Sequence, residues 1–149
     1  MNISIIIPFY NEELVIPITL KRLKTLFLEL DLREDCSEIE LLMVDDGSKD
    51  RTFELLTAVA KTEKRFKVIR LSNNFGHQAA LLAGYELAKG DVIVSLDADL
   101  QDPPEFIKTM LDKINEGHDV VYAARQTRKN DTIFKRKTAE LFYWIMKKF

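Results

Sequence analysis

The chain has 149 residues, of which 46% are hydrophobic and 31% are charged. This size and composition suit one globular domain with its own core and exclude disordered and fibrous proteins. The single cysteine, Cys36, has no partner for an internal disulfide, and no secretory signal pattern opens the chain, so we expect a reducing, cytoplasmic setting. The longest apolar runs, such as residues 3–9, are far shorter than the roughly 20 residues that cross a bilayer, which excludes a membrane-spanning segment from this sequence.

The formal net charge of −2 hides an uneven distribution. Residues 125–149 carry eight Lys or Arg against two acidic residues, a net charge of +6, whereas residues 1–124 carry −8. A basic segment of this kind favours an anionic partner. Residues 132–149 add aromatic side chains, which predicts a basic amphipathic helix; a solvated face or a partner-binding helix is the alternative interpretation. No Gly or Pro ends this helix, so we expect the chain to be cut short after residue 149.

Apolar runs of strand length alternate with stretches of helical period along the chain. This order is typical of βαβ units stacked into a mainly parallel sheet, so the predicted fold class is α/β. The predicted strands are residues 3–8, 40–44, 67–71, 91–96 and 119–123. The predicted helices are residues 17–31, 51–64, 77–89 and 103–116.

Local chemistry supports several of these boundaries. Pro17 suits the first turn of its helix, because deeper inside it would remove a backbone hydrogen bond. Asp102 is predicted to cap the last of these helices, with two prolines in the first turn and Glu105 as the capping-box partner. Gly90 and Gly117 each follow a helix, where a left-handed residue would end it.

Acidic residues follow three of the predicted strands. In open α/β sheets, ligands bind beyond the carboxyl ends of the strands, so these loops are candidates for a binding site. The loops are residues 9–13 (FYNEE), 45–48 (DDGS) and 97–102 (DADLQD). Their convergence on one edge of the sheet suggests a bound cation.

Asp97 and Asp99 are separated by one residue at a strand end, so in an extended chain their carboxylates point to the same side, with Gln101 behind them. Mg²⁺ or Mn²⁺ prefers such oxygen ligands and completes its shell with water and substrate phosphate oxygens. The cation would hold a diphosphate and neutralise it as it leaves. By itself the D-x-D spacing is weak, because helix caps and solvated turns also produce it.

Other residues have simpler interpretations. Asp45 and Asp46 are suited to a turn before Gly47 as well as to a nucleotide site. His77 more often caps a helix or fills a loop than takes part in catalysis. The only other histidine is His118, so no histidine metal cluster is available.

Four motifs together resemble the family 2 glycosyltransferases, most closely the polyprenyl-phosphate and dolichyl-phosphate sugar synthases. The motifs are residues 5–13 (IIIPFYNEE), 44–48 (VDDGS), 74–77 (NFGH) and 97–105 (DADLQDPPE). The resemblance covers essentially the whole chain. It implies a GT-A fold, a Rossmann-like three-layer sandwich, together with a divalent cation and inverting transfer from a nucleotide-diphosphate sugar. It also implies a nucleotide-sugar-binding domain over residues 1–131, followed by a membrane-interfacial helix over residues 132–149.

The resemblance assigns roles to residues at matching positions. Asp97, Asp99 and Arg125 are expected to be catalytic, and Asp97, Asp99 and Gln101 to surround the Mg²⁺ or Mn²⁺. Arg125, Arg128 and Arg136 would lie near an acceptor phosphate, although arginines here could also be ordinary surface charge. The expected nucleotide-sugar-binding residues are Pro8, Tyr10, Glu12, Asp45, Asp46, Asp97, Ala98, Asp99 and Gln101.

The leading hypothesis is transfer of a sugar, from a UDP-sugar rather than a GDP-sugar, to an undecaprenyl or dolichyl phosphate at the cytoplasmic membrane face. We expect a peripheral or anchored protein, compatible with a homo-oligomer and with no nucleic-acid partner. One alternative is a family 2 enzyme that acts on a saccharide hydroxyl. Another is a non-catalytic fragment that binds the nucleotide sugar. A Rossmann dehydrogenase is disfavoured, because no G-x-G-x-x-G follows the first strand.

Overall fold

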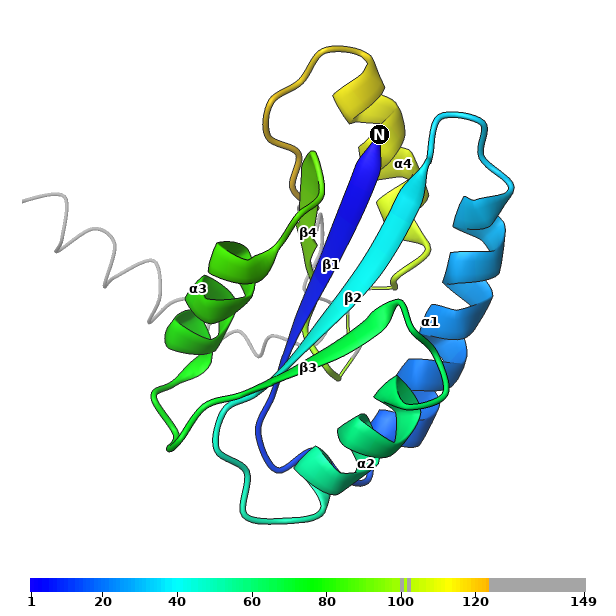
Figure 1. Ribbon diagram of the computed structural model, residues 1–149. Helices are drawn as coiled ribbons and strands as arrows, with labels where there is room; N and C mark the ends of the chain where they lie inside the picture. Colours follow the sequence, from blue (N-terminus) through cyan, green and yellow to red (C-terminus); the bar gives the residue numbers. More distant parts are fainter. Residues whose placement is uncertain (100, 102, 124–149) are drawn as a thin grey trace, which may run out of the picture. The chain divides into compact units, whose positions relative to one another are not determined.

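A four-stranded parallel sheet forms the centre of the computed structural model (Figure 1). The strand order is β3-β2-β1-β4, so β1 pairs with both β2 and β4. The strands are β1 (Asn2–Phe9), β2 (Glu38–Asp45), β3 (Phe66–Arg70) and β4 (Val92–Ser95). The structure describes residues 1–99, 101 and 103–123.

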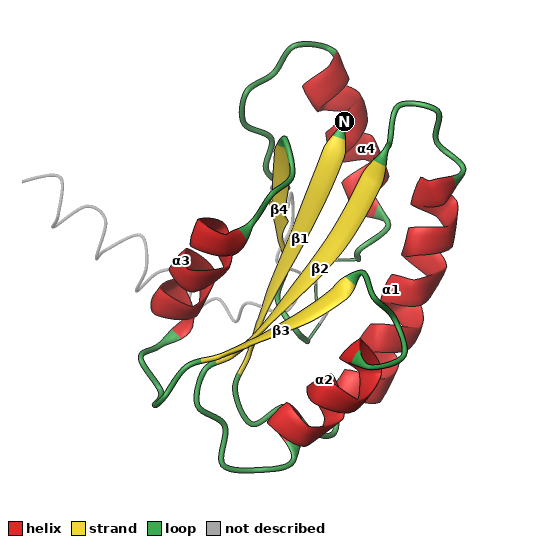
Figure 2. Cartoon of the chain, viewed as in Figure 1, coloured by secondary structure: helices red, strands yellow, loops and turns green. Residues whose placement is uncertain are grey.

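Helices cover both faces of this sheet (Figure 2). The helices are α1 (Ile16–Asp31), α2 (Thr52–Ala60), α3 (His77–Leu87) and α4 (Phe106–Asn115). α1, α2 and α4 pack against one face and α3 packs against the other. The predicted three-layer α/β architecture with a parallel sheet is therefore confirmed.

The apolar sequence of β1 explains its central place. Ile3, Ile5 and Ile7 pack into the core beneath α1, α2 and α4, whereas Ile6 packs with Ala80 of α3 on the opposite face. A strand that is covered on both faces needs apolar residues in a continuous run rather than in alternation. α3 lies so close to β1 that a Cβ atom added at Gly84 would be 2.4 Å from Cγ2 of Ile6.

The predicted fifth strand, residues 119–123, is wrong: these residues form no strand in the structure. Val120 and Tyr122 are each 81% exposed. A β-branched or aromatic sequence becomes a strand only where a neighbouring strand and a covering layer receive it. Met1–Asp119 form one compact unit, and residues 120–123 are the described part of a second.

Two predicted helix boundaries also need correction. α4 begins at Phe106, and Glu105 makes no side-chain capping bond; its carboxylate instead forms an ion pair with Arg22 of α1 at 2.8 Å. Gly90 is not left-handed; a Cβ there would lie 2.5 Å from the backbone nitrogen of Ser4, so close packing requires this glycine. Pro17 in the first turn of α1 and the left-handed Gly117 are confirmed.

In the part of the chain that the structure describes, no helix is both long enough and apolar enough to cross a membrane. The predicted basic helix at residues 132–149 lies outside the described residues.

Candidate active site

The carboxyl ends of β1, β2 and β4 meet at one edge of the sheet because the three strands run in the same direction. The backbone N–H of Asp46 donates to the Phe9 carbonyl at 2.9 Å, and that of Leu96 donates to the Ile6 carbonyl at 3.0 Å. These bonds extend the strand pairing into the loops after β2 and β4. The predicted acidic loops therefore lie beside one another, as ligand-binding loops do in other open parallel sheets.

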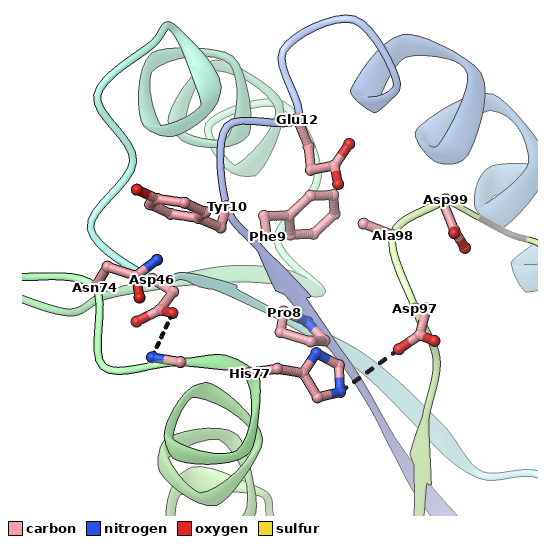
Figure 3. A pocket seen from close by; sticks show the side chains of 11 residues that line it. Pro8, Phe9, Tyr10, Glu12, Asp46, Asn74, His77, Asp97, Ala98 and Asp99 are labelled. Atoms are coloured by element: carbon pink, nitrogen blue, oxygen red, sulfur yellow. Dashed lines mark hydrogen bonds and ion pairs between the residues drawn. The ribbon is translucent and has the colours of Figure 1, made fainter. Parts of the chain in front are cut away.

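A cavity of about 540 Å³ opens at this edge (Figure 3). The predicted site residues that line it are Pro8, Tyr10, Glu12, Asp46, Asp97, Ala98 and Asp99. The remaining lining residues are Phe9, Asn74, Gly76 and His77, which were not among the predicted nucleotide-sugar-binding residues. Residues 74–77 follow β3, so the strand-end reasoning used for the acidic loops would have found most of them.

Asp46 holds the loop between β3 and α3 in place. Its carboxylate is buried and accepts hydrogen bonds from the backbone N–H groups of Phe75 at 2.8 Å and Gly76 at 2.9 Å. Gly47 has a φ of +66°, and a Cβ there would lie 2.4 Å from the backbone carbon of Asn73. The chain bends at Gly47, directly after this acidic pair, and the Asp46 carboxylate fixes a second loop at the cavity.

The segment that carries Asp97 and Asp99 is held from the opposite side by α1. Thr19 donates its hydroxyl hydrogen to the buried carbonyl of Ala98 at 2.7 Å. The backbone N–H of Gln101 donates to Oδ1 of Asp99 at 3.0 Å, and the Gln101 side chain does not line the cavity. Both carboxylates stay at the cavity while the residue between them is anchored in the core.

Asp45 lies beneath the cavity rather than in its wall. It is fully buried, and its Oδ1 accepts the backbone N–H of Ser48 at 3.2 Å. Nε of Arg70 lies 3.3 Å from Oδ2 without forming a hydrogen bond. Arg70 and Tyr10 line a neighbouring cavity of about 720 Å³, so the aromatic ring of Tyr10 stands between the two spaces.

The pKa of Glu12 is raised at this site. Burial of its side chain raises the pKa of Glu12 above the ordinary value, and the nearby carboxylates of Asp99 and Asp50 raise it further.

A divalent cation at Asp97 and Asp99 would relieve the repulsion between these carboxylates, so the donor set fits such an ion. Among the described residues, no three acidic, His or Cys side chains form a ready-made metal site, so water or phosphate oxygens would have to complete the shell.

The three predicted acceptor-site arginines, Arg125, Arg128 and Arg136, lie outside the described residues. Their roles and that of Gln101 remain predictions.

Comparison with known proteins identifies the family. Residues 4–149 match the model of glycosyl transferase family 2, and the chain belongs to this family. It is 49% identical over 143 residues to the uncharacterized glycosyltransferase YkcC of Bacillus subtilis, covering 96% of this chain and 43% of that protein. It is 40% identical over 148 residues to a prophage bactoprenol glucosyl transferase homolog of Escherichia coli, covering 99% and 47%. The chain thus spans less than half the length of these relatives.

Solved structures show the same GT-A fold. Staphylococcus aureus TarS 1–349 in complex with UDP-GlcNAc has a TM-score of 0.55 and 26% identity, covering 74% of this chain and 32% of that one. The mannosyltransferase PcManGT of Pyrobaculum calidifontis, in complex with GDP-Man and Mn²⁺, has a TM-score of 0.55 and 25% identity, covering 68% and 32%. The expected fold and family are both confirmed.

The two hydrogen bonds that the Asp46 carboxylate accepts from Phe75 and Gly76, here called the Asp46 clamp, can be tested by removing the carboxylate. Asp46→Ala leaves the N–H groups of Phe75 and Gly76 without their acceptor, so we expect the free energy of unfolding in urea to fall by about 2 kcal/mol. Amide hydrogen exchange at these two residues should accelerate. Asp46→Asn keeps one acceptor oxygen and should lose less stability. Unchanged exchange at both amides in the alanine variant would contradict the clamp.

The raised pKa of Glu12 predicts a pH-dependent effect on stability. A raised pKa means that the folded protein binds the Glu12 proton more tightly than the unfolded chain, so ionised Glu12 destabilises the fold. Glu12→Gln should therefore raise the melting temperature at pH 7, and the gain should disappear below the unfolded value of about 4.3. The exposed Glu86→Gln is the matched control and should show no gain. A lower melting temperature for Glu12→Gln at pH 7 would refute this electrostatic account.

Proposed function

We propose that the protein to which this chain belongs transfers a sugar from a nucleotide-diphosphate sugar to a polyprenyl phosphate, with inversion at the anomeric carbon. The observation that carries the donor half is the convergence of Asp97 and Asp99 with Tyr10 and Glu12 on one open cavity. A UDP-sugar is the favoured donor, and the complexes of similar proteins with UDP-GlcNAc and with GDP-Man support a nucleotide-sugar ligand of this kind.

The cavity suits the two ends of such a donor differently. Tyr10 provides an exposed aromatic face for a base and lines the neighbouring cavity together with Arg70. Nε of Arg70 lies 3.3 Å from the carboxylate of the buried Asp45. Asp97 and Asp99 lie at the opposite, acidic side, where they would hold Mg²⁺ or Mn²⁺. The cation would neutralise the departing diphosphate as a Lewis acid. The Mn²⁺ complex of PcManGT supports this choice of ion.

The acceptor half is supported by relatives that are named bactoprenol glucosyl transferases and by the basic segment of the chain. In the proposed step, an acceptor phosphate oxygen forms a bond to the anomeric carbon while the bond from that carbon to the diphosphate oxygen breaks. The acceptor oxygen is already ionised near pH 7, so the step needs no strong general base. We propose that Arg125, Arg128 and Arg136 bind this phosphate and that Gln101 supports the cation site.

We also propose a division of labour along the chain. Residues 1–131 would bind the nucleotide sugar, and residues 132–149 would lie at the cytoplasmic membrane interface, where basic side chains meet anionic lipid and aromatic side chains meet the headgroup boundary.

The donor site can be tested by calorimetric titration of UDP and GDP, each with and without Mn²⁺. We expect one nucleotide to bind in a metal-dependent manner, and the double variant Asp97→Ala, Asp99→Ala to lose that binding. Glu34→Ala removes an exposed carboxylate that precedes the amino end of β2, whereas the cavity lies beyond its carboxyl end, and this variant should bind as the unmodified chain does. If neither nucleotide binds to the unmodified chain, the proposed donor site is wrong.

The acceptor can be tested with the full-length gene product, undecaprenyl phosphate in detergent and radiolabelled UDP-glucose, UDP-GlcNAc and GDP-mannose. We expect label from one donor to enter the lipid-extractable fraction. Arg125→Ala should reduce this transfer at least tenfold, about the effect of losing one hydrogen bond to a charged group, while metal-dependent nucleotide binding is retained. Transfer to a saccharide hydroxyl instead of the lipid would contradict the proposed acceptor.

A further inference from the structure

The cavity carries an excess of negative charge, and an anionic ligand would increase it. Four of its lining residues carry carboxylates: Glu12, Asp46, Asp97 and Asp99. A nucleoside diphosphate brings further negative charge, and one divalent cation cannot balance all of it. Among the described lining residues, His77 carries no carboxylate and has a ring N–H that can be donated to an anion.

The structure holds His77 firmly at this place. It is the first residue of α3 and follows the loop whose backbone N–H groups are bound by Asp46. Its side chain is half-exposed and points across the cavity toward Asp97 (Figure 3). The loop is therefore anchored in the buried part of the site, while the imidazole remains free to meet a ligand.

The contact between His77 and Asp97 is too weak to be the reason for this arrangement. Nε2 of His77 lies 3.6 Å from Oδ1 of Asp97, which is longer than a hydrogen bond, and both side chains are at least half exposed. Ion pairs of this kind contribute little to stability. A ligand between the two residues would replace the contact at small cost.

We propose that His77 contacts the distal phosphate of the bound nucleoside diphosphate, opposite the edge that Asp97 and Asp99 provide. This inference rests on the proposed function and adds a donor-binding residue to it. An imidazole has an N–H to donate in its neutral and in its protonated form, so the contact is available across the neutral pH range. His77 would thereby distinguish diphosphates from monophosphates.

The test compares His77→Ala with the unmodified chain in calorimetric titrations with Mn²⁺ present. The probes are the nucleoside diphosphate that binds, UDP or GDP, and its own monophosphate. We expect the variant to bind the diphosphate about tenfold more weakly and the monophosphate with unchanged affinity, because loss of one hydrogen bond to a charged group has roughly this effect. His77→Gln keeps an N–H donor and should recover part of the loss. His118→Ala, at the other histidine, should have no effect.

Several outcomes would overturn the inference while leaving the proposed function in place. Equal weakening of both nucleotides would mean that the imidazole only shapes the cavity. Unchanged diphosphate binding would mean that it makes no contact. Weaker binding of Mn²⁺ alone would mean that His77 acts by orienting Asp97. If the unmodified chain binds neither UDP nor GDP, the proposed function fails and the inference fails with it.

Discussion

Parallel pairing of β1 with both β2 and β4 brings three segments that are distant in sequence to one edge of the sheet. β1 can occupy this central position because its apolar residues fill the cores on both faces, and the strands of a parallel sheet are covered on both sides. Because the three strands are parallel, the loops that follow them lie at the same edge of the sheet. The candidate site is a consequence of this arrangement rather than an addition to it.

The chemistry of that edge is dominated by carboxylates in close proximity. Burial of the side chain raises the pKa of Glu12, and the neighbouring carboxylates of Asp99 and Asp50 raise it further, so ionised Glu12 opposes folding. Carboxylates with perturbed pKa values are concentrated at functional sites. The complementary groups proposed here are a divalent cation and, from the protein itself, an N–H of the His77 imidazole. The two together would turn an unfavourable apo site into a favourable binding site for an anionic donor.

The loops are rigid where they carry these groups and open where a ligand would enter. Asp46 and Gly47 join the loop after β2 to the loop before α3, and Thr19 joins α1 to the segment between Asp97 and Asp99. All of these anchoring contacts involve the backbone or buried side chains. The side chains left at the cavity are therefore presented by a supported frame, which lowers the cost of ordering them when the ligand binds.

Sequence alone determined the alternation of strands and helices, the parallel sheet and the acidic loops, because each depends on periodicity and on residues near one another in the chain. It also led to the family through four motifs in the right order. Tertiary structure decided which residues meet: His77, after β3, faces Asp97, after β4, although these strands lie at opposite edges of the described sheet. It also buried Asp45 rather than exposing it in the cavity wall, and residues 119–123 form no strand within the part of the chain that the structure describes. Strand order and burial depend on packing between distant segments, and local patterns in a sequence carry no record of that packing.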